Sequence, residues 1–214
     1  MLLLAERPAY FINNEKVSVK NFLFEWFSGF SVSQKQKSIE SLHGAILKTD
    51  NSAEPLEIST KSKNPLGVKL SAFNLKLNNH TLENIFQSSK VFTKGGAYRD
   101  LLEVSPKDAK RDLRLKNSGE LKYFDYNGEI FPLFPKTFFY DYIYIKAVKN
   151  SLSYDEIQKI KKYNYFTDIE FNPAKSINSQ AKTVAIIRIL LDMYGNIPDF
   201  NKNEFMDFHN KYVI

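Results

Sequence analysis

Three polar side chains between residues 81 and 94 have types and spacing suited to chemistry on a phosphate-bearing ligand. Glu83, Gln87 and Lys90 stand four and three residues apart, which places them on one stripe of a helix. A carboxylate there can act as a general acid or base, an amide can orient a polar ligand, and an ammonium group can hold a phosphate. The same residues can also form an ordinary solvated face with weak helix pairs. The residue types alone leave both interpretations open.

The segment around this stripe predicts a strand, a turn and a helix. Residues 68–75 have the character of a strand, and Asn78-Asn79-His80 forms a turn. A helix is expected from about residue 81 to residue 94, where Gly95-Gly96 would end it because glycine tolerates a left-handed C-terminal conformation. The stripe would then lie beside an apolar helix face.

The rest of the chain alternates a few extended segments with helices. Ser33 and Gln36 have the spacing of a capping box that begins a helix reaching about residue 47. Asn127-Gly128 is a strong two-residue hairpin signal. We expect extended segments at 2–12, 19–27 and 166–171, and helices at 105–119, 137–149, 176–194 and 196–214. This order predicts an α+β fold, a helix-rich single domain with a few strands and a β-hairpin.

Composition excludes several classes of site. The 214 residues include 43% hydrophobic residues, enough for a sizeable core in one domain, and no cysteine. Thiol nucleophiles, disulfides and thiolate metal sites are therefore excluded. The three histidines, His43, His80 and His209, are isolated, so we expect a metal-independent protein without a cofactor. No apolar run reaches about 18 residues and the apolar start is too short for a signal sequence, so we expect no membrane span and a cytoplasmic location.

Positive charge is concentrated near the central stripe. The chain has a net charge of +6, and residues 61–120 hold 12 Lys and Arg against 6 Asp and Glu. Such a field attracts phosphate, whether in a nucleotide or a nucleic acid, although an ordinary basic surface would look the same. Lys110, Arg111 and Arg114 lie on the most basic helix. They are candidates for nucleic-acid contact, or belong to a solvated helix balanced by nearby aspartates.

Two further sets of polar residues are candidates for ligand binding. Hydroxyls and lysines are the groups a pyrophosphate needs, and the candidates are Lys35, Lys37, Ser59, Lys61 and Ser62. A helix start rich in amides can bind an anion or an amide-bearing base, and the candidates there are Asn172, Ser176, Asn178 and Gln180. Exposed polar loops and plain capping explain the same patterns equally well.

Several stretches together resemble one known family. LSAFN at 70–74 precedes LENIFQSSKVF at 82–92, and further matching stretches are FSVSQKQKSIESLH at 30–43, EISTKS at 57–62, AKRDLRLKNSGEL at 109–121, FPLFPKTFFYDYIYI at 131–145 and FTDIEFNPAKSINSQAK at 166–182. As a set they resemble the NADAR (YbiA-like) family, in the branch associated with DarT-type DNA ADP-ribosyltransferase toxins. The resemblance covers roughly residues 7–191. The long portion before residue 70 and the order of polar groups in 70–74 depart from the wider family.

The resemblance implies a single NADAR-like domain over residues 1–214 with an N-terminal elaboration of about 1–66. It implies an antitoxin that hydrolyses the N-glycosidic bond between ADP-ribose and guanine bases of DNA. ADP-ribosylated DNA would be the substrate, ADP-ribose the product and a DarT-type toxin a possible partner. Two other functions stay open: an N-glycosidase acting on a small nucleotide metabolite, and a non-catalytic module that binds ADP-ribose or the toxin.

The same resemblance assigns roles to the candidate residues. Glu83 would be the general acid or base, because cleavage at an anomeric carbon needs a carboxylate. Lys90 would bind phosphate or attack an opened ribose as an amine, which would need a depressed pKa. Asn74, Gln87 and the amides of residues 172–180 would orient ribose and base, and the Lys35 to Ser62 set would hold the pyrophosphate. Asp168 is a further candidate for the site.

Overall fold

The computed structural model describes residues 3–174 and 176–213 and has a mixed α+β architecture, as the sequence predicts. Its contacts group into two compact units, each described here by itself. Unit 1 draws on Met1–Ser71, Leu152–Asp199 and Lys211–Ile214, and unit 2 on Ala72–Ser151 and Phe200–Asn210. The expectation of one domain with an N-terminal elaboration stays a prediction.

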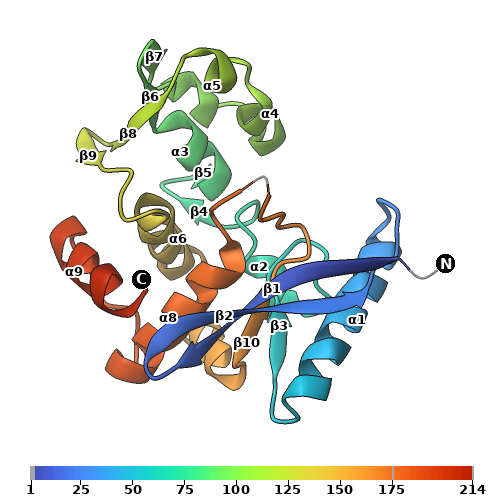
Figure 1. Cartoon of the computed structure of the whole chain (residues 1–214). Helices are drawn as coiled ribbons and strands as arrows, with labels where there is room; N and C mark the ends of the chain where they lie inside the picture. The colour runs from blue at the N-terminus through green and yellow to red at the C-terminus, as the bar shows by residue number, and fades with distance from the viewer. Residues whose placement is uncertain (1–2, 175, 214) are drawn as a thin grey trace. The chain divides into compact units, whose positions relative to one another are not determined.

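Unit 1 is built on a four-stranded sheet in the order β2-β1-β10-β3 (Figure 1). β1 (Leu4–Asn13) and β2 (Lys16–Glu25) form a long antiparallel hairpin, β10 (Tyr165–Thr167) is antiparallel to β1, and β3 (Pro55–Glu57) is parallel to β10. Helices α1 (Val32–Thr49) and α8 (Gln180–Tyr194) pack against this sheet. The remaining helices of this unit are α2 (Pro65–Lys69), α7 (Tyr154–Gln158) and the 3₁₀ turn η2 (Lys159–Lys162). The core includes Phe22, Phe24, Ile39, Leu42, Ile46 and Tyr165.

Unit 2 contains the segment that the sequence places at the centre of the chemistry. A small hairpin of β4 (Lys76–Leu77) and β5 (His80–Thr81) leads into helix α3 (Leu82–Ser88). A second sheet has the order β7-β6-β8-β9, from Gly95–Gly96, Lys90–Phe92, Leu121–Tyr126 and Glu129–Phe131. The remaining elements are η1 (Arg99–Leu102), α4 (Pro106–Arg111), α5 (Arg114–Asn117), α6 (Phe138–Ser151) and most of α9 (Lys202–Tyr212).

Stacked aromatic rings form the core of unit 2. Phe139 on α6 lies 4.6 Å from Phe124 on β8 and 6.2 Å from Phe86 on α3, between ring centroids. In the same first turn of α6, the buried carboxylate of Asp141 lies 3.0 Å from His209 Nε2 on α9. A carboxylate buried among aromatic rings needs such a hydrogen-bonding partner.

Several predicted elements are confirmed and others are wrong at their ends. The extended segments near residues 2–12 and 19–27, the Asn127-Gly128 hairpin and the helix near 137–149 are present, although residue 2 lies outside the described part. The capping box at Ser33 is wrong: Ser31 caps α1 by accepting a hydrogen bond from Gln34 N. The predicted basic helix divides into α4 and α5, because the Asp112 carboxylate accepts the backbone N–H of Arg114.

The largest correction concerns the segment around the polar stripe. Residues 68–75 are not a strand, because Asn64 caps α2 and Pro65 occupies its first turn, so the chain enters residue 70 from a helix. Helix α3 ends at Ser88 rather than near residue 94. Beyond it, Lys90 begins strand β6, and Gly95–Gly96 form β7 instead of a helix cap. The helix predicted from residue 176 begins at Gln180.

Candidate functional site

Glu83, Gln87 and Lys90 form a continuous hydrogen-bonded row in unit 2. Thr81 caps α3 through Asn84 N, and Glu83 and Gln87 are buried on this short helix. Gln87 Nε2 donates to Glu83 Oε1 at 2.8 Å, and Lys90 Nζ donates to Gln87 Oε1 at 2.7 Å. The structure therefore brings together the three residues that the spacing selected, with the amide as the link between carboxylate and amine.

The environment of Lys90 is unusual for a lysine. Its Nζ lies 4.7 Å from the centroid of the Phe86 ring. Burial lowers the pKa of Lys90 to about 8; the nearby Glu83 carboxylate opposes this change and the Lys110 ammonium adds to it. A substantial fraction of Lys90 is therefore a neutral amine near physiological pH, the form that can attack a carbon atom.

Lys110 belongs to the same group of side chains. Its Nζ lies 3.9 Å from Glu83 Oε1 and 5.6 Å from the centroid of the exposed Phe73 ring. The sequence assigned Lys110 to nucleic-acid contact on a basic helix. The structure places it beside the candidate carboxylate, so its charge acts on both Glu83 and Lys90.

The other two predicted nucleic-acid contacts differ from each other. The Arg114 guanidinium pairs with Asp100 and Asp112 and lies 4.5 Å from the Tyr98 ring centroid. Two carboxylates offset its charge, which makes it a weaker candidate for a phosphate. Arg111 is exposed in the last turn of α4. Contact of either arginine with DNA stays a prediction.

Unit 1 contains a buried polar cluster that the sequence analysis did not select. Glu57 accepts hydrogen bonds from Thr167 Oγ1 at 2.7 Å and from Ile169 N at 2.8 Å. His43 Nε2 lies 2.9 Å from the same threonine hydroxyl, and burial lowers the pKa of His43 to about 4, so the imidazole is neutral. Burial raises the pKa of Glu57. A carboxylate between Leu56 and Ile58 was the available sequence signal, but its partners are distant in the chain.

Asp168 stands next to this cluster. Its carboxylate accepts hydrogen bonds from Glu170 N at 3.0 Å and from Gln180 Nε2 at 2.9 Å. Burial raises the pKa of Asp168 to about 7, and the Glu57 carboxylate adds to the effect. Lys35 Nζ lies 3.4 Å from the Glu170 carboxylate and 4.5 Å from the Trp26 ring centroid. Asp168, Gln180 and Lys35 are thus predicted site residues that the structure gathers in one region of unit 1.

The predicted pyrophosphate ligands in the loop after β3 are engaged within that loop. Ser59 and Ser62 are buried; Ser59 Oγ accepts from Lys61 N, and Ser62 Oγ accepts from Asn64 N. A Cβ atom on Gly67 would lie 2.6 Å from Ser62 Oγ, so the loop packs tightly against α2. These contacts give both serine hydroxyls hydrogen-bond partners within the protein, so no ligand is needed to satisfy them. A phosphate-binding role for the serines and Lys61 stays a prediction.

The remaining candidates lie on α1, in a turn and in a loop. Lys37 is exposed, with its Nζ 6.0 Å from the Phe27 ring centroid, and Asn74 is exposed in a turn. Asn172 Oδ1 accepts from Ala174 N, and Ser176 Oγ donates to Asn178 O, so these residues shape their own loop. Roles of these residues in ligand binding stay predictions.

The described residues offer neither a metal cluster nor a membrane-spanning helix. Within residues 3–174 and 176–213, no three His, Asp or Glu side chains lie close enough to hold a metal ion. No helix in that same part of the chain has the length and apolar character needed to cross a membrane.

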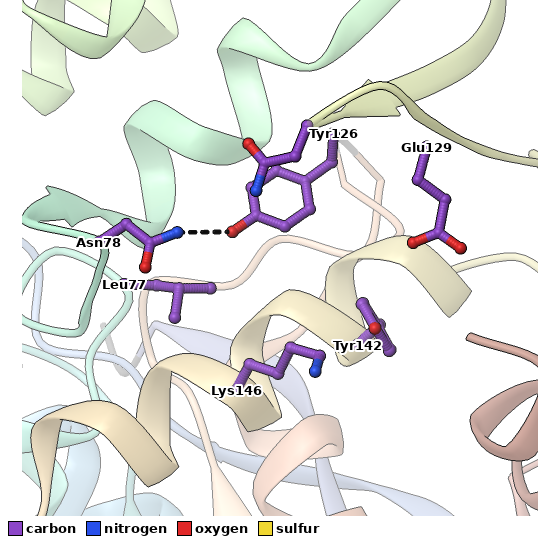
Figure 2. Close-up of a pocket in the computed structure, with 7 residues that line it drawn as sticks. Leu77, Asn78, Tyr126, Glu129, Tyr142 and Lys146 are labelled. Atoms are coloured by element: carbon purple, nitrogen blue, oxygen red, sulfur yellow. Dashed lines mark hydrogen bonds between the residues drawn. The ribbon is translucent and has the colours of Figure 1, made fainter. Parts of the chain in front are cut away.

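A pocket in unit 2 was also missed by the sequence analysis (Figure 2). Its volume is about 310 Å³, and its lining comes from Leu77, Asn78, Tyr126, Asn127, Glu129, Tyr142 and Lys146. These residues come from separate elements, β4, the β8–β9 hairpin and α6, and no short motif marks them.

Comparison with known families gives one finding. The family model NADAR-DarT1, described as a DarT1-associated NADAR antitoxin, matches residues 5–214. A comparison with curated proteins gave no match. The match extends across both units and includes the residues of the hydrogen-bonded row.

Proposed function

Because the chain belongs to the family of DarT1-associated NADAR antitoxins, we propose that it removes ADP-ribose from guanine bases of DNA. The reaction would hydrolyse the N-glycosidic bond between C1′ of the ribose and the exocyclic nitrogen of guanine. It would reverse the modification made by a DarT-type toxin. ADP-ribosylated DNA is the proposed substrate and free ADP-ribose the proposed product.

The observation that carries this proposal is the hydrogen-bonded row in unit 2. Such a reaction needs a group that attacks or stabilises C1′ and a group that moves a proton to the leaving nitrogen. Lys90 has the lowered pKa that an attacking amine requires, and Gln87 holds it in line with the Glu83 carboxylate. Between the two roles considered for Lys90, attack and phosphate binding, the lowered pKa favours attack.

The steps of the proposed reaction balance without a metal or cofactor. A proton on the ring oxygen opens the ribose and leaves a protonated imine between C1′ and the guanine nitrogen. The neutral Lys90 amine attacks C1′, the bond between C1′ and the guanine nitrogen breaks, and C1′ becomes a protonated imine of Lys90. Glu83 takes the proton that Lys90 loses and passes it to the guanine nitrogen. Water then adds to C1′, the bond between C1′ and Lys90 breaks, and Lys90 regains its proton. Unmodified guanine and ADP-ribose are the products.

The test is an incubation with single-stranded DNA that carries ADP-ribosylated guanine. Wild type should release ADP-ribose and leave intact DNA, and Glu83→Gln should slow release by about 10²- to 10⁴-fold, the range for loss of a positioned acid or base. Lys90→Arg keeps the positive charge but removes the nucleophile, and should be similarly slow. Lys94→Gln, an exposed lysine four residues further along, is the matched control and should retain activity.

Cyanoborohydride added during turnover separates the two roles of Lys90. Attack by Lys90 predicts a reduced ADP-ribosyl adduct on that residue, located by peptide mass spectrometry. Active Lys90→Arg protein with no adduct in wild type would mean that Lys90 binds phosphate. Release by Glu83→Gln at the wild-type rate would disprove the role of the carboxylate. No release by wild type would leave a metabolite glycosidase or a binding module.

A further inference from the structure

The pocket in Figure 2 has walls of two chemical kinds. Tyr126 faces it from the end of β8, and Tyr142 and Lys146 face it from one side of α6. Lys146 Nζ lies 4.8 Å from the centroid of the Tyr142 ring, and within the described residues it has no carboxylate partner. The pocket therefore combines aromatic surface with an ammonium group that forms no direct ion pair with a described residue, although the Glu129 carboxylate also lines it.

The other polar groups of the pocket are hydrogen-bonding groups with little net charge. Asn78 Nδ2 donates to the Tyr126 hydroxyl at 3.4 Å, and the Glu129 carboxylate lies 3.4 Å from Lys202 Nζ. Burial raises the pKa of Tyr142 to about 12 and also raises the pKa of Tyr126, so both phenols stay neutral. Neutral hydroxyls, amides and a paired carboxylate can satisfy both the donors and the acceptors on the edge of a heterocyclic base.

Size and chemistry together select one class of ligand. Small-molecule pockets begin at about 300 Å³, so this one suits a ligand about the size of a single nucleotide. Bases stack on aromatic side chains with little sequence preference, and a lysine is a usual partner of a phosphate. A nucleotide whose base lies against the tyrosines and whose phosphate contacts Lys146 would use both the aromatic surface and the positive charge.

The pocket also lies close to the reactive row within unit 2. Tyr126 lies 6.2 Å from Phe139 between ring centroids, and Phe139 lies 6.2 Å from Phe86, the ring beneath Lys90. In the sheet, Lys90 pairs with Phe124, two residues before Tyr126 on the same strand. The pocket and the row are thus connected through the aromatic core of unit 2 and through strand β8.

We propose that this pocket binds one unmodified nucleotide of the DNA strand that carries the modified guanine. The proposal rests on the proposed function for its choice of strand, but the pocket's binding of a nucleotide can be measured without any reaction. The pocket would supply affinity for the strand, and the row at Lys90 would supply the chemistry.

The experiment is an NMR titration of the whole protein with each of the four deoxynucleoside 5′-monophosphates, and separately with inorganic phosphate. Tyr126, Tyr142 and Lys146 should be the residues whose signals move. Lys146→Gln should weaken nucleotide binding by at least about fivefold, because a charged contact to phosphate is lost. Lys146→Arg should retain most of it. Lys48→Gln, an exposed lysine at the end of α1, is the control and should bind like wild type.

The outcomes separate this inference from the proposed function. Binding lost in Lys146→Gln but kept in Glu83→Gln supports the pocket, even if neither protein hydrolyses modified DNA. Binding lost in Glu83→Gln and kept in Lys146→Gln would place the nucleotide at the reactive row and overturn the inference. Absence of nucleotide binding, or equal binding of inorganic phosphate alone, would also overturn it. In hydrolysis, Lys146→Gln should raise KM for a modified strand and leave KM for the modified nucleoside unchanged.

Discussion

Two substitutions beside Lys90 should move its pKa in opposite directions. Glu83→Gln removes a carboxylate that favours the charged amine, so the pKa of Lys90 should fall below its value of about 8. Lys110→Gln removes a cation that disfavours the charged amine, so that pKa should rise. The first variant should therefore have a more reactive amine even though it loses the proposed proton carrier.

The expected size follows from the geometry. Lys90 reaches Glu83 through a single amide, by contacts of 2.7 and 2.8 Å. Charges roughly 6 Å apart at an effective dielectric constant of about 20 interact by about 2–3 kcal/mol, which corresponds to a pKa change of about 2. Lys90 is only partly buried and Lys110 is exposed, so solvent screening should reduce the change to about 1 for each substitution. At pH 7.5 a pKa of about 8 leaves about a quarter of Lys90 neutral. The neutral fraction should rise to about three quarters in Glu83→Gln and fall to about 3% in Lys110→Gln.

The assay is competitive acylation of lysines across a range of pH, with the labelling of each residue measured by peptide mass spectrometry. Lys94, exposed and close in sequence, is the internal reference. The midpoint of Lys90 labelling should be near pH 8 in wild type, lower in Glu83→Gln and higher in Lys110→Gln. Midpoints that match Lys94 in all three proteins would refute the reasoning, because burial would then not be depressing the pKa of Lys90. Movement in the same direction in both variants would show a structural change instead of a charge effect.

The remaining predictions concern stability. Because burial raises the folded-state pKa of Asp168 from 3.8 to about 7, its contribution to stability is fully present below about pH 4 and is lost as the pH rises through about 7. Asp168→Asn should therefore flatten the pH profile of urea unfolding and exceed wild-type stability at pH 8 by up to about 4 kcal/mol; an unchanged profile would contradict this. His209→Ala removes a partner of the buried Asp141 and should lower the free energy of unfolding by about 3–5 kcal/mol, whereas a loss below about 1 kcal/mol would mean that the pair contributes little. Ser31→Ala should lower the free energy of unfolding by about 1 kcal/mol because it removes the cap of α1, and Ser33→Ala should lower it by less. A larger loss in Ser33→Ala would mean that Ser33 is the cap, as the sequence suggested.

Elements with local signals were predictable from the sequence. Ser153 and Glu156 have the spacing of a capping box and make both of its reciprocal hydrogen bonds, and the predicted Asn127-Gly128 turn lies between β8 and β9. The family resemblance was equally accessible, because its matching stretches are spread over most of the chain. Such features depend on residues within a few positions of each other, so no tertiary information is needed.

Elements whose ends depend on distant partners were not predictable. Helical spacing continues past Ser88, but the hydroxyls of Ser88 and Ser89 bond back to Ile85 O at the end of the helix. The chain then pairs with β8, more than 30 residues further along. For residues 68–75 a local signal did exist, since Asn64-Pro65 is a cap followed by proline. The apolar alternation after it suggested a strand and outweighed that signal.

The error at the end of α3 has a direct consequence for the chemistry. On a longer helix, Lys90 would still follow Gln87 on the same stripe, so the spacing correctly predicted which residues meet. A lysine on a solvated helix face, one of the two interpretations that the sequence left open, would keep its hydration and an ordinary pKa. As the first residue of β6, Lys90 is instead fixed by its pairing with Phe124 and held over the Phe86 ring, where burial lowers its pKa. Spacing therefore identifies the partners of Lys90, and the sheet that the sequence did not place explains the burial and lowered pKa of its amine.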